Sequence, residues 1–368
     1  MKARRSSLLR PLIRPARRSR GPFRQRVPLR AVALGGALTL GALTLTACGG
    51  DSAADDGKVS VVTSFYPMEF LTREIGGDHV SVSTLTGPGT EPHGLELSPR
   101  QVGEIGEADL VVYVKGLQPA VDTAVEQSGA EHLAEATSFV SLEKNGAGEH
   151  GEEHREEQAG AHGEEHSGEH GHGDEHTGED PGHEESGHEG HDHSTADGDP
   201  HVWLDPVRYA KIAEGVSKKL AEADPEHAPA YEKNADRLVQ RLEKLDRDFT
   251  AGLKDRTGDT FLTTHAAFGY LADRYGLHEE SIAGLDPESG SVSGAHLKEL
   301  HTLVEEDGVS TVFTEPGAEK GTARALAGDL DLKTDVLNPV AVVQPGEQDY
   351  FTVMRQNLQA LRTALGAA

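Results

Sequence analysis

Segments with the character of buried β-strands alternate with helical segments in both halves of the chain. In the first half, the β-branched runs Val59–Phe65 and Val80–Leu85 flank a helical segment, Pro67–Gly77, that ends in a glycine pair. In the second half, the runs Thr260–Thr264 and Val309–Thr314 repeat the pattern. Strands connected through helices pair in parallel, because the helix returns the chain to the end of the sheet where it started. The alternation therefore predicts the α/β class, with two similar domains that each contain a central parallel sheet.

A long amphipathic helix is predicted between these two halves. Its apolar positions recur at steps of four and three residues, and at ~1.5 Å per residue a helix of about 25 residues reaches roughly 40 Å. We expect a rigid helix that joins the two domains, although a coiled-coil seam has the same periodicity. The apolar positions are Tyr231, Ala235, Leu238, Leu242, Leu245 and Phe249.

The 368 residues are long enough for two ordinary domains, and the composition shifts place their boundaries. We expect an N-terminal domain over 58–223, the linking helix over 224–257 and a C-terminal domain over 258–368. The other predicted helices are 98–106, 206–222, 266–275, 297–306, 321–330 and 350–365, and the other predicted strands are 109–114, 139–142 and 335–340.

The N-terminus has the features of a secretory signal. Residues 1–30 carry eleven basic and no acidic side chains, and the apolar run Ala31–Ala47 follows. Leu45-Thr46-Ala47-Cys48 resembles a bacterial lipobox, in which Cys48 is lipidated and becomes the mature N-terminus. Residues 1–47 are thus predicted to be a signal peptide and 48–57 a flexible tether, so that the protein is exported and anchored by lipid to the outer face of the cell membrane. Because Cys48 is the only cysteine, no intramolecular disulfide can form.

A His/Glu/Gly tract over residues 144–199 has almost no apolar residue with which to build a core. We expect it to be disordered without metal and to bind Zn²⁺ weakly at several places, because imidazole and carboxylate are both zinc ligands. The alternative is a solvated linker that happens to be rich in histidine. Its histidines are His150, His154, His162, His166, His170, His172, His176, His183, His188, His191 and His193.

Three histidines outside the tract occupy constrained positions. His93 lies in a loop after a predicted strand, His201 lies between two Asp-Pro pairs, and His265 ends a predicted strand. Ligands bind beyond the carboxyl ends of parallel strands, so these side chains can point into a cleft between the two domains. Three neutral imidazoles and one oxygen make a tetrahedral Zn²⁺ site. We therefore predict zinc, bound as cargo, in the interdomain cleft.

The net charge of −27 argues against nucleic acid as a partner. Removal of residues 1–47 would make the charge more negative still, because that segment holds only basic charges. Much of the acidity is local, since eighteen Asp or Glu residues fall between Glu149 and Asp199.

Five blocks of sequence resemble the metal-binding solute-binding proteins of zinc and manganese ABC transporters, the ZnuA-like group. The resemblance covers nearly the whole mature chain. The blocks are Gly89-Thr-Glu-Pro-His93, Asp199-Pro-His201-Val-Trp-Leu-Asp-Pro206, Thr264-His265-Ala-Ala-Phe-Gly-Tyr270, Phe313-Thr-Glu315-Pro316 and Asp349-Tyr-Phe-Thr-Val-Met-Arg355.

The resemblance implies a zinc receptor that delivers its metal to a membrane permease, with little domain motion on binding. The implied ligands are His93, His201 and His265, and a histidine at the last position is typical of zinc binders rather than manganese binders. Asn338 departs from the family, which often has an aspartate there that can be a fourth ligand. The fourth position is then water or Glu91, and Glu315 is expected to support a histidine through a hydrogen bond.

Three other functions remain open from the sequence. A manganese receptor would use the same fold, and a surface metal buffer or adhesin would act through the His-rich tract. A zinc hydrolase would need only an acidified water on a three-histidine zinc. Because the chain has no HExxH motif and no nucleophile elbow, we expect no enzyme, and we expect a monomer that works with an ABC permease.

Overall fold

The computed structural model describes residues 57–143, 198–283, 293–316, 325, 327–328, 331–342 and 349–367. All of them belong to one compact unit, Asp55–Ala368. The predicted signal peptide, Cys48, the eleven histidines of the tract and most of the predicted helix 321–330 lie outside the described residues. Within the described part of the chain, no helix has both the length and the apolar character that a membrane span requires.

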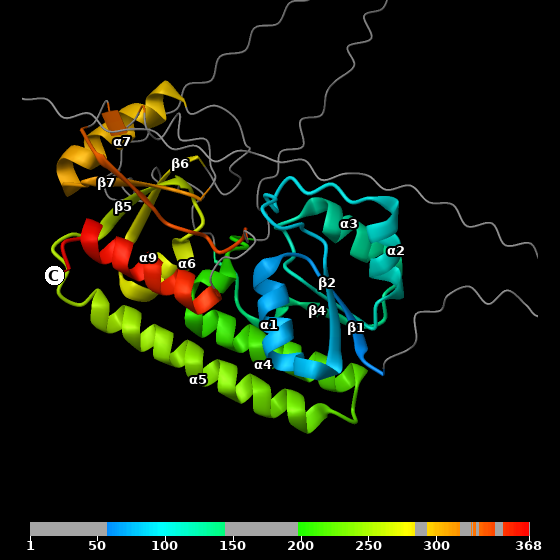
Figure 1. Cartoon of the computed structure of the whole chain (residues 1–368). Helices are drawn as coiled ribbons and strands as arrows, with labels where there is room; N and C mark the ends of the chain where they lie inside the picture. Colours follow the sequence, from blue (N-terminus) through cyan, green and yellow to red (C-terminus); the bar gives the residue numbers. More distant parts are fainter. Residues whose placement is uncertain are drawn as a thin grey trace, which may run out of the picture. The chain divides into compact units, whose positions relative to one another are not determined.

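The first domain is built on a four-stranded parallel sheet with strand order β2-β1-β3-β4 (Figure 1). β1 and β3, which have neighbours on both sides, are made almost entirely of buried residues, as expected of a parallel sheet covered on both faces. The strands are β1 (Val59–Thr63), β2 (Val80–Thr84), β3 (Leu110–Tyr113) and β4 (Leu133–Glu135).

The second domain repeats this arrangement in a parallel sheet of order β6-β5-β7-β8. In each sheet the second strand along the chain pairs with one side of the first strand, and the third strand pairs with its other side. The loops that follow the first and third strands therefore meet at the carboxyl edge, where open α/β sheets bind ligands. The strands are β5 (Thr260–His265), β6 (His278–Ala283), β7 (Thr311–Thr314) and β8 (Lys333–Val336).

The prediction of two α/β domains with central parallel sheets is confirmed. The predicted strand 139–142 is wrong, because the chain there forms a 3-10 turn, Ala136–Phe139, and the last strand of the first sheet is β4. Phe139 packs instead on helix α4: a Cβ placed on Gly215 would lie 2.4 Å from the Phe139 ring. The described helices are α1 (Tyr66–Gly76), α2 (Pro99–Glu107), α3 (Pro119–Ser128), α4 (Pro206–Ala223), α5 (Ala228–Gly252), α6 (Gly269–Tyr275), α7 (Gly294–Asp307) and α9 (Tyr350–Ala364).

Helix α5 is the long helix predicted from its periodicity. Its 25 residues lie alongside α4, and it also packs on α1 of the first domain and α9 at the end of the chain (Figure 1). Its buried residues are the six predicted ones, Tyr231, Ala235, Leu238, Leu242, Leu245 and Phe249.

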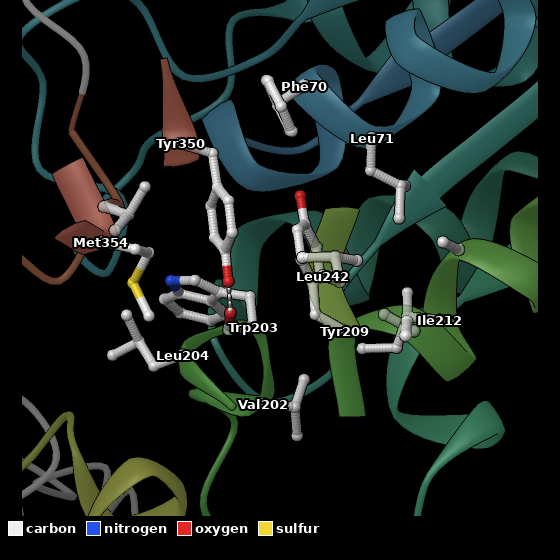
Figure 2. Packing of buried hydrophobic residues seen from close by; sticks show 14 of the residues in the cluster. Phe70, Leu71, Val202, Trp203, Leu204, Tyr209, Ile212, Leu242, Tyr350 and Met354 are labelled. Carbon is white, nitrogen blue, oxygen red and sulfur yellow. Dashed lines mark hydrogen bonds between the residues drawn. The ribbon is translucent and has the colours of Figure 1, made fainter. Parts of the chain in front are cut away.

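One hydrophobic core connects the two domains, and Trp203 lies within it (Figure 2). The indole Nε1 of Trp203 donates a hydrogen bond to the Pro339 carbonyl at 2.7 Å, and Tyr350 Oη donates to the Trp203 carbonyl at 2.7 Å. Tyr209 stacks near Tyr350, with ring centroids 4.7 Å apart. Trp203 thus joins segments from far apart in the sequence, only two residues after His201.

Candidate metal site

His93 lies in the loop that follows β2. The base of this loop is fixed by Thr86, whose hydroxyl donates to the Ser64 carbonyl at 2.8 Å. Within the loop, Glu91 Oε1 lies 2.6 Å from His93 Nδ1 and also accepts the His93 backbone N–H at 3.4 Å. The carboxylate therefore holds the ring by Nδ1, which leaves Nε2 as the free ring nitrogen.

His201 is held by a similar local arrangement. Asp199 Oδ1 lies 2.8 Å from His201 Nδ1 and accepts the His201 backbone N–H at 2.9 Å. The following residues form the 3-10 turn Val202–Leu204, and Asp205 caps α4 by accepting the backbone N–H of Val207. Both His201 and Asp199 are completely buried.

The two segments share the pattern acid, proline, histidine. In Glu91-Pro92-His93 and in Asp199-Pro200-His201, the proline fixes the backbone so that the acid meets the imidazole two residues later. Sequence reasoning named Glu91 as a possible fourth ligand or a group that supports a ligand, and it placed Asp199 at the end of the His-rich tract. The repeated tripeptide is the signal that would have identified both as partners of the histidines.

His265 is the last residue of β5, and its partner comes from the neighbouring strand. Glu315 follows β7, which pairs with β5 in parallel, so both residues lie at the carboxyl edge of the second sheet. Glu315 Oε1 bonds to His265 Nδ1. This is the hydrogen bond expected from the sequence, and it again leaves Nε2 free.

The three histidines converge, although 108 residues separate the first from the second. His93 Nε2 and His201 Nε2 are 3.3 Å apart, and one possible ligand nitrogen from each histidine lies within 4.8 Å of the others. Two nitrogens bound to one tetrahedral Zn²⁺ at ~2.0 Å are separated by about 3.3 Å. The observed spacing between His93 and His201 is therefore the spacing that zinc requires.

A buried nitrogen without a hydrogen-bond partner also fits a metal-binding role. His265 Nε2 is buried and has no hydrogen-bond partner among the described residues. Such an atom is costly unless something binds it. Three imidazole nitrogens, each backed by a carboxylate on Nδ1, are the donor set of a zinc site, and a carboxylate in that place fixes the tautomer and strengthens the ligand.

The electrostatics of the site favour a neutral His201. Burial lowers the pKa of His201, and the nearby His265 and His93 lower it further. Burial raises the pKa of Asp199, whereas the hydrogen bond from the His201 backbone lowers it. Burial also opposes ionisation of Glu91, but the hydrogen bonds and charge of His93 outweigh it and lower its pKa. A neutral imidazole has the free lone pair that a metal needs.

Asn338 lies near the end of β8, but its side-chain oxygen has another partner. Asn338 Oδ1 accepts the backbone N–H of Val340 at 2.8 Å, and its own backbone bonds to the side chain of Asn357. Glu91 and Glu315 each bond to a histidine Nδ1, as carboxylates do that orient a metal-binding histidine. The fourth position therefore stays a prediction, with water or Glu91 as the candidates.

Comparisons with known proteins identify the family of the chain. The ZnuA family model, described as zinc-uptake complex component A, periplasmic, matches residues 61–364. The high-affinity zinc uptake system protein ZnuA of Bacillus subtilis is 34% identical over 333 residues, which is 88% of this chain and 94% of that protein. The zinc-binding lipoprotein AdcA of Streptococcus pneumoniae is 33% identical over 332 residues.

This match covers 88% of the chain but only 59% of the length of AdcA. The crystal structure of the Zn(II)-bound ZnuA-like domain of the same AdcA superposes with a TM-score of 0.63 and 29% identity, over 84% of this chain and 99% of that domain. Because the family model spans most of the sequence and several relatives exceed 30% identity over most of its length, the chain belongs to the ZnuA family.

Proposed function

We propose that this protein is an extracytoplasmic receptor that captures Zn²⁺ on His93, His201 and His265 and delivers it to the permease of an ABC importer. The observation that carries the proposal is the convergence of three imidazoles, each oriented by a carboxylate on Nδ1. The names of the relatives support zinc as the cargo. The lipobox-like sequence at Cys48 supports attachment to the membrane as a lipoprotein, and we propose that the receptor works as a monomer.

The donor set favours zinc over manganese. Imidazole nitrogen suits Zn²⁺, whereas Mn²⁺ prefers carboxylate, carbonyl and water oxygens. Each of the three carboxylates at the site bonds to a histidine Nδ1, so imidazole nitrogens make up most of the donor set. The same engagement leaves none of the three as a free general base, which supports binding rather than hydrolysis.

Calorimetric titration of Zn²⁺ and Mn²⁺ into the mature chain tests the proposal. We expect one tight zinc site, together with weaker zinc binding from the tract, and little binding of manganese. His265→Ala should weaken the tight site by at least about 100-fold, because it removes one of three ligands. His278→Ala is the matched control, since His278 is an exposed histidine on the neighbouring strand β6.

The cellular role has a separate test. A strain that lacks the gene should grow poorly in medium treated with a zinc chelator and recover when zinc, but not manganese, is added. Recovery with manganese alone would argue for the manganese receptor.

In the titration, a wild-type protein with only weak zinc sites would instead support the metal-buffer interpretation.

A further inference from the structure

The two ends of the 144–197 segment meet beside the metal site. Glu143 is the last described residue before it, and Gly198 is the first described residue after it. The backbone N–H of Asp199 donates to the Glu143 carbonyl at 2.9 Å, which joins the two ends directly. Since the side chain of Asp199 also bonds to His201, the contact between the two ends helps to fix the position of this candidate ligand.

A tyrosine from the second domain bridges the same junction. Tyr270 Oη accepts the backbone N–H of Glu143 at 3.0 Å and donates to the Asp199 carbonyl at 2.8 Å. Tyr270 is completely buried, and burial raises its pKa to about 12, so the hydroxyl keeps its proton and remains a donor. One hydroxyl therefore ties together both chain segments at the junction.

The surroundings of Tyr270 fix its position. The guanidinium of Arg208 lies 4.4 Å from the centre of the Tyr270 ring and bonds to the Glu143 carboxylate and the Ser141 carbonyl. Tyr270 is the second residue of α6, five residues after His265. The helix that follows one candidate ligand thus reaches the residue that orients another.

We propose that Tyr270 is a positioning residue of the zinc site, which acts by holding the backbone of Asp199 so that its carboxylate keeps His201 aimed at the metal. This role rests on the proposed zinc-binding function. The connection has two steps: Tyr270 Oη to the Asp199 carbonyl, and Asp199 Oδ1 to His201 Nδ1. Tyr270 does not touch the metal, so its removal should loosen the site without removing a ligand.

The expected loss of zinc affinity depends on how many contacts separate Tyr270 from the metal-binding histidine. Loss of a group that bonds directly to a metal-binding histidine typically lowers metal affinity by about 10- to 100-fold. Tyr270 is one step further away, so Tyr270→Phe should lower zinc affinity by about tenfold, mainly through faster zinc release. The ring and its contact with Arg208 are kept in this variant.

Tyr275→Phe is a matched control on the same helix. Tyr275 is also buried, its hydroxyl bonds to Asp246 Oδ1 at 3.2 Å, and its ring stacks on Phe249 at 5.1 Å. Each substitution removes one hydroxyl, so each should destabilise the metal-free protein by a similar, small amount. Only Tyr270→Phe should change zinc affinity, whereas Tyr275→Phe should stay within about twofold of the wild type.

Zinc affinity is measured by competition with a chelator in the full mature chain, beside the thermal midpoint of the metal-free protein. Equal zinc affinity in Tyr270→Phe and the wild type would overturn the inference alone. A wild type without a tight site would overturn the proposed function and this inference with it. Equal losses of affinity in both tyrosine variants would reveal a general structural effect and also overturn the inference.

A double-mutant cycle tests the route of the effect. If Tyr270 acts through Asp199, its substitution should cost much less affinity in an Asp199→Ala background, which lacks the carboxylate that holds His201, than in the wild type. Additive losses would contradict the proposed connection. This readout separates positioning from stability, because a purely structural loss would persist in both backgrounds.

Discussion

At the scale of single residues, the site consists of three histidine and carboxylate pairs built in two ways. Two pairs are local, because an acid and its histidine are separated by one proline. The third pair joins residues 50 positions apart on neighbouring strands. The sequence alone identified the three histidines by their constrained surroundings. It also suggested Glu315, and the repeated acid, proline, histidine pattern would have added Asp199, which sequence reasoning assigned to the tract.

The Glu315 pair should contribute to zinc affinity without providing a ligand. Glu315→Gln keeps an oxygen that can accept from His265 Nδ1 but removes the charge, so we expect zinc affinity to fall by about tenfold, near the lower end of the usual range. Competition titration with a chelator measures it. The control is Glu299→Gln, which changes an exposed carboxylate on α7. An affinity in Glu315→Gln equal to that of the control would contradict the assigned role.

At the scale of helices and strands, the alternation of patterns predicted most of the two sheets. It missed β4, which has only three residues, and β6, whose sequence His278-Glu-Glu-Ser-Ile-Ala283 is polar. Both are edge strands, and their pairing is decided by the neighbouring strand rather than by their own apolar pattern. Residues that join elements at long range, such as Tyr270 and Glu279, have no local signal.

Glu279 on β6 joins this strand to the turn between β5 and α6. Its carboxyl group accepts the Phe268 backbone N–H and the Thr263 hydroxyl, each at 2.8 Å. Burial raises its pKa to about 8. Between the ordinary carboxyl pKa and pH 8, the folded protein therefore keeps a proton that the unfolded chain has released. Because the folded state then binds more protons, this group makes stability fall as pH rises toward 8.

Glutamine cannot ionise, so we predict that the stability of Glu279→Gln falls less than that of the wild type as the pH rises toward 8. Urea unfolding of the metal-free protein at pH 5.5 and pH 8 should show a smaller loss of stability in Glu279→Gln than in the wild type. Glu305→Gln, an exposed carboxylate on α7, should retain the wild-type dependence. Equal losses in all three proteins would show that Glu279 does not titrate in this range.

At the scale of the whole molecule, a single core spans both domains, and the site lies directly against it. Trp203 bonds to two residues of the C-terminal part of the chain, and this connection could not be predicted from local patterns because these partners, Pro339 and Tyr350, are more than 130 residues away. A shared core resists the rotation of one domain against the other. The small domain motion that the family resemblance implies stays a prediction, which this shared core supports.

The same architecture predicts that the metal site does not depend on the His-rich tract. Glu143 and Asp199 are already hydrogen-bonded, so a short Gly/Ser turn can replace residues 144–197 without moving either end. Shortening a connection of about fifty residues to about four lowers the cost of loop closure by roughly 2 kcal/mol. The shortened protein should thus be at least as stable as the wild type and should keep one tight zinc site.

A second variant separates the length of the tract from its chemistry. Replacing its eleven histidines with glutamine keeps length and charge but removes the imidazoles. Zinc titration should show that both variants lose the weak additional equivalents and keep the tight one, because neither variant changes the three histidines or the carboxylates that orient them, Glu91, Asp199 and Glu315. If both variants lost the tight site, the tract itself would be the main binding element. If only the shortened one lost it, the two ends at Glu143 and Asp199 would need the longer connection to keep His201 in place.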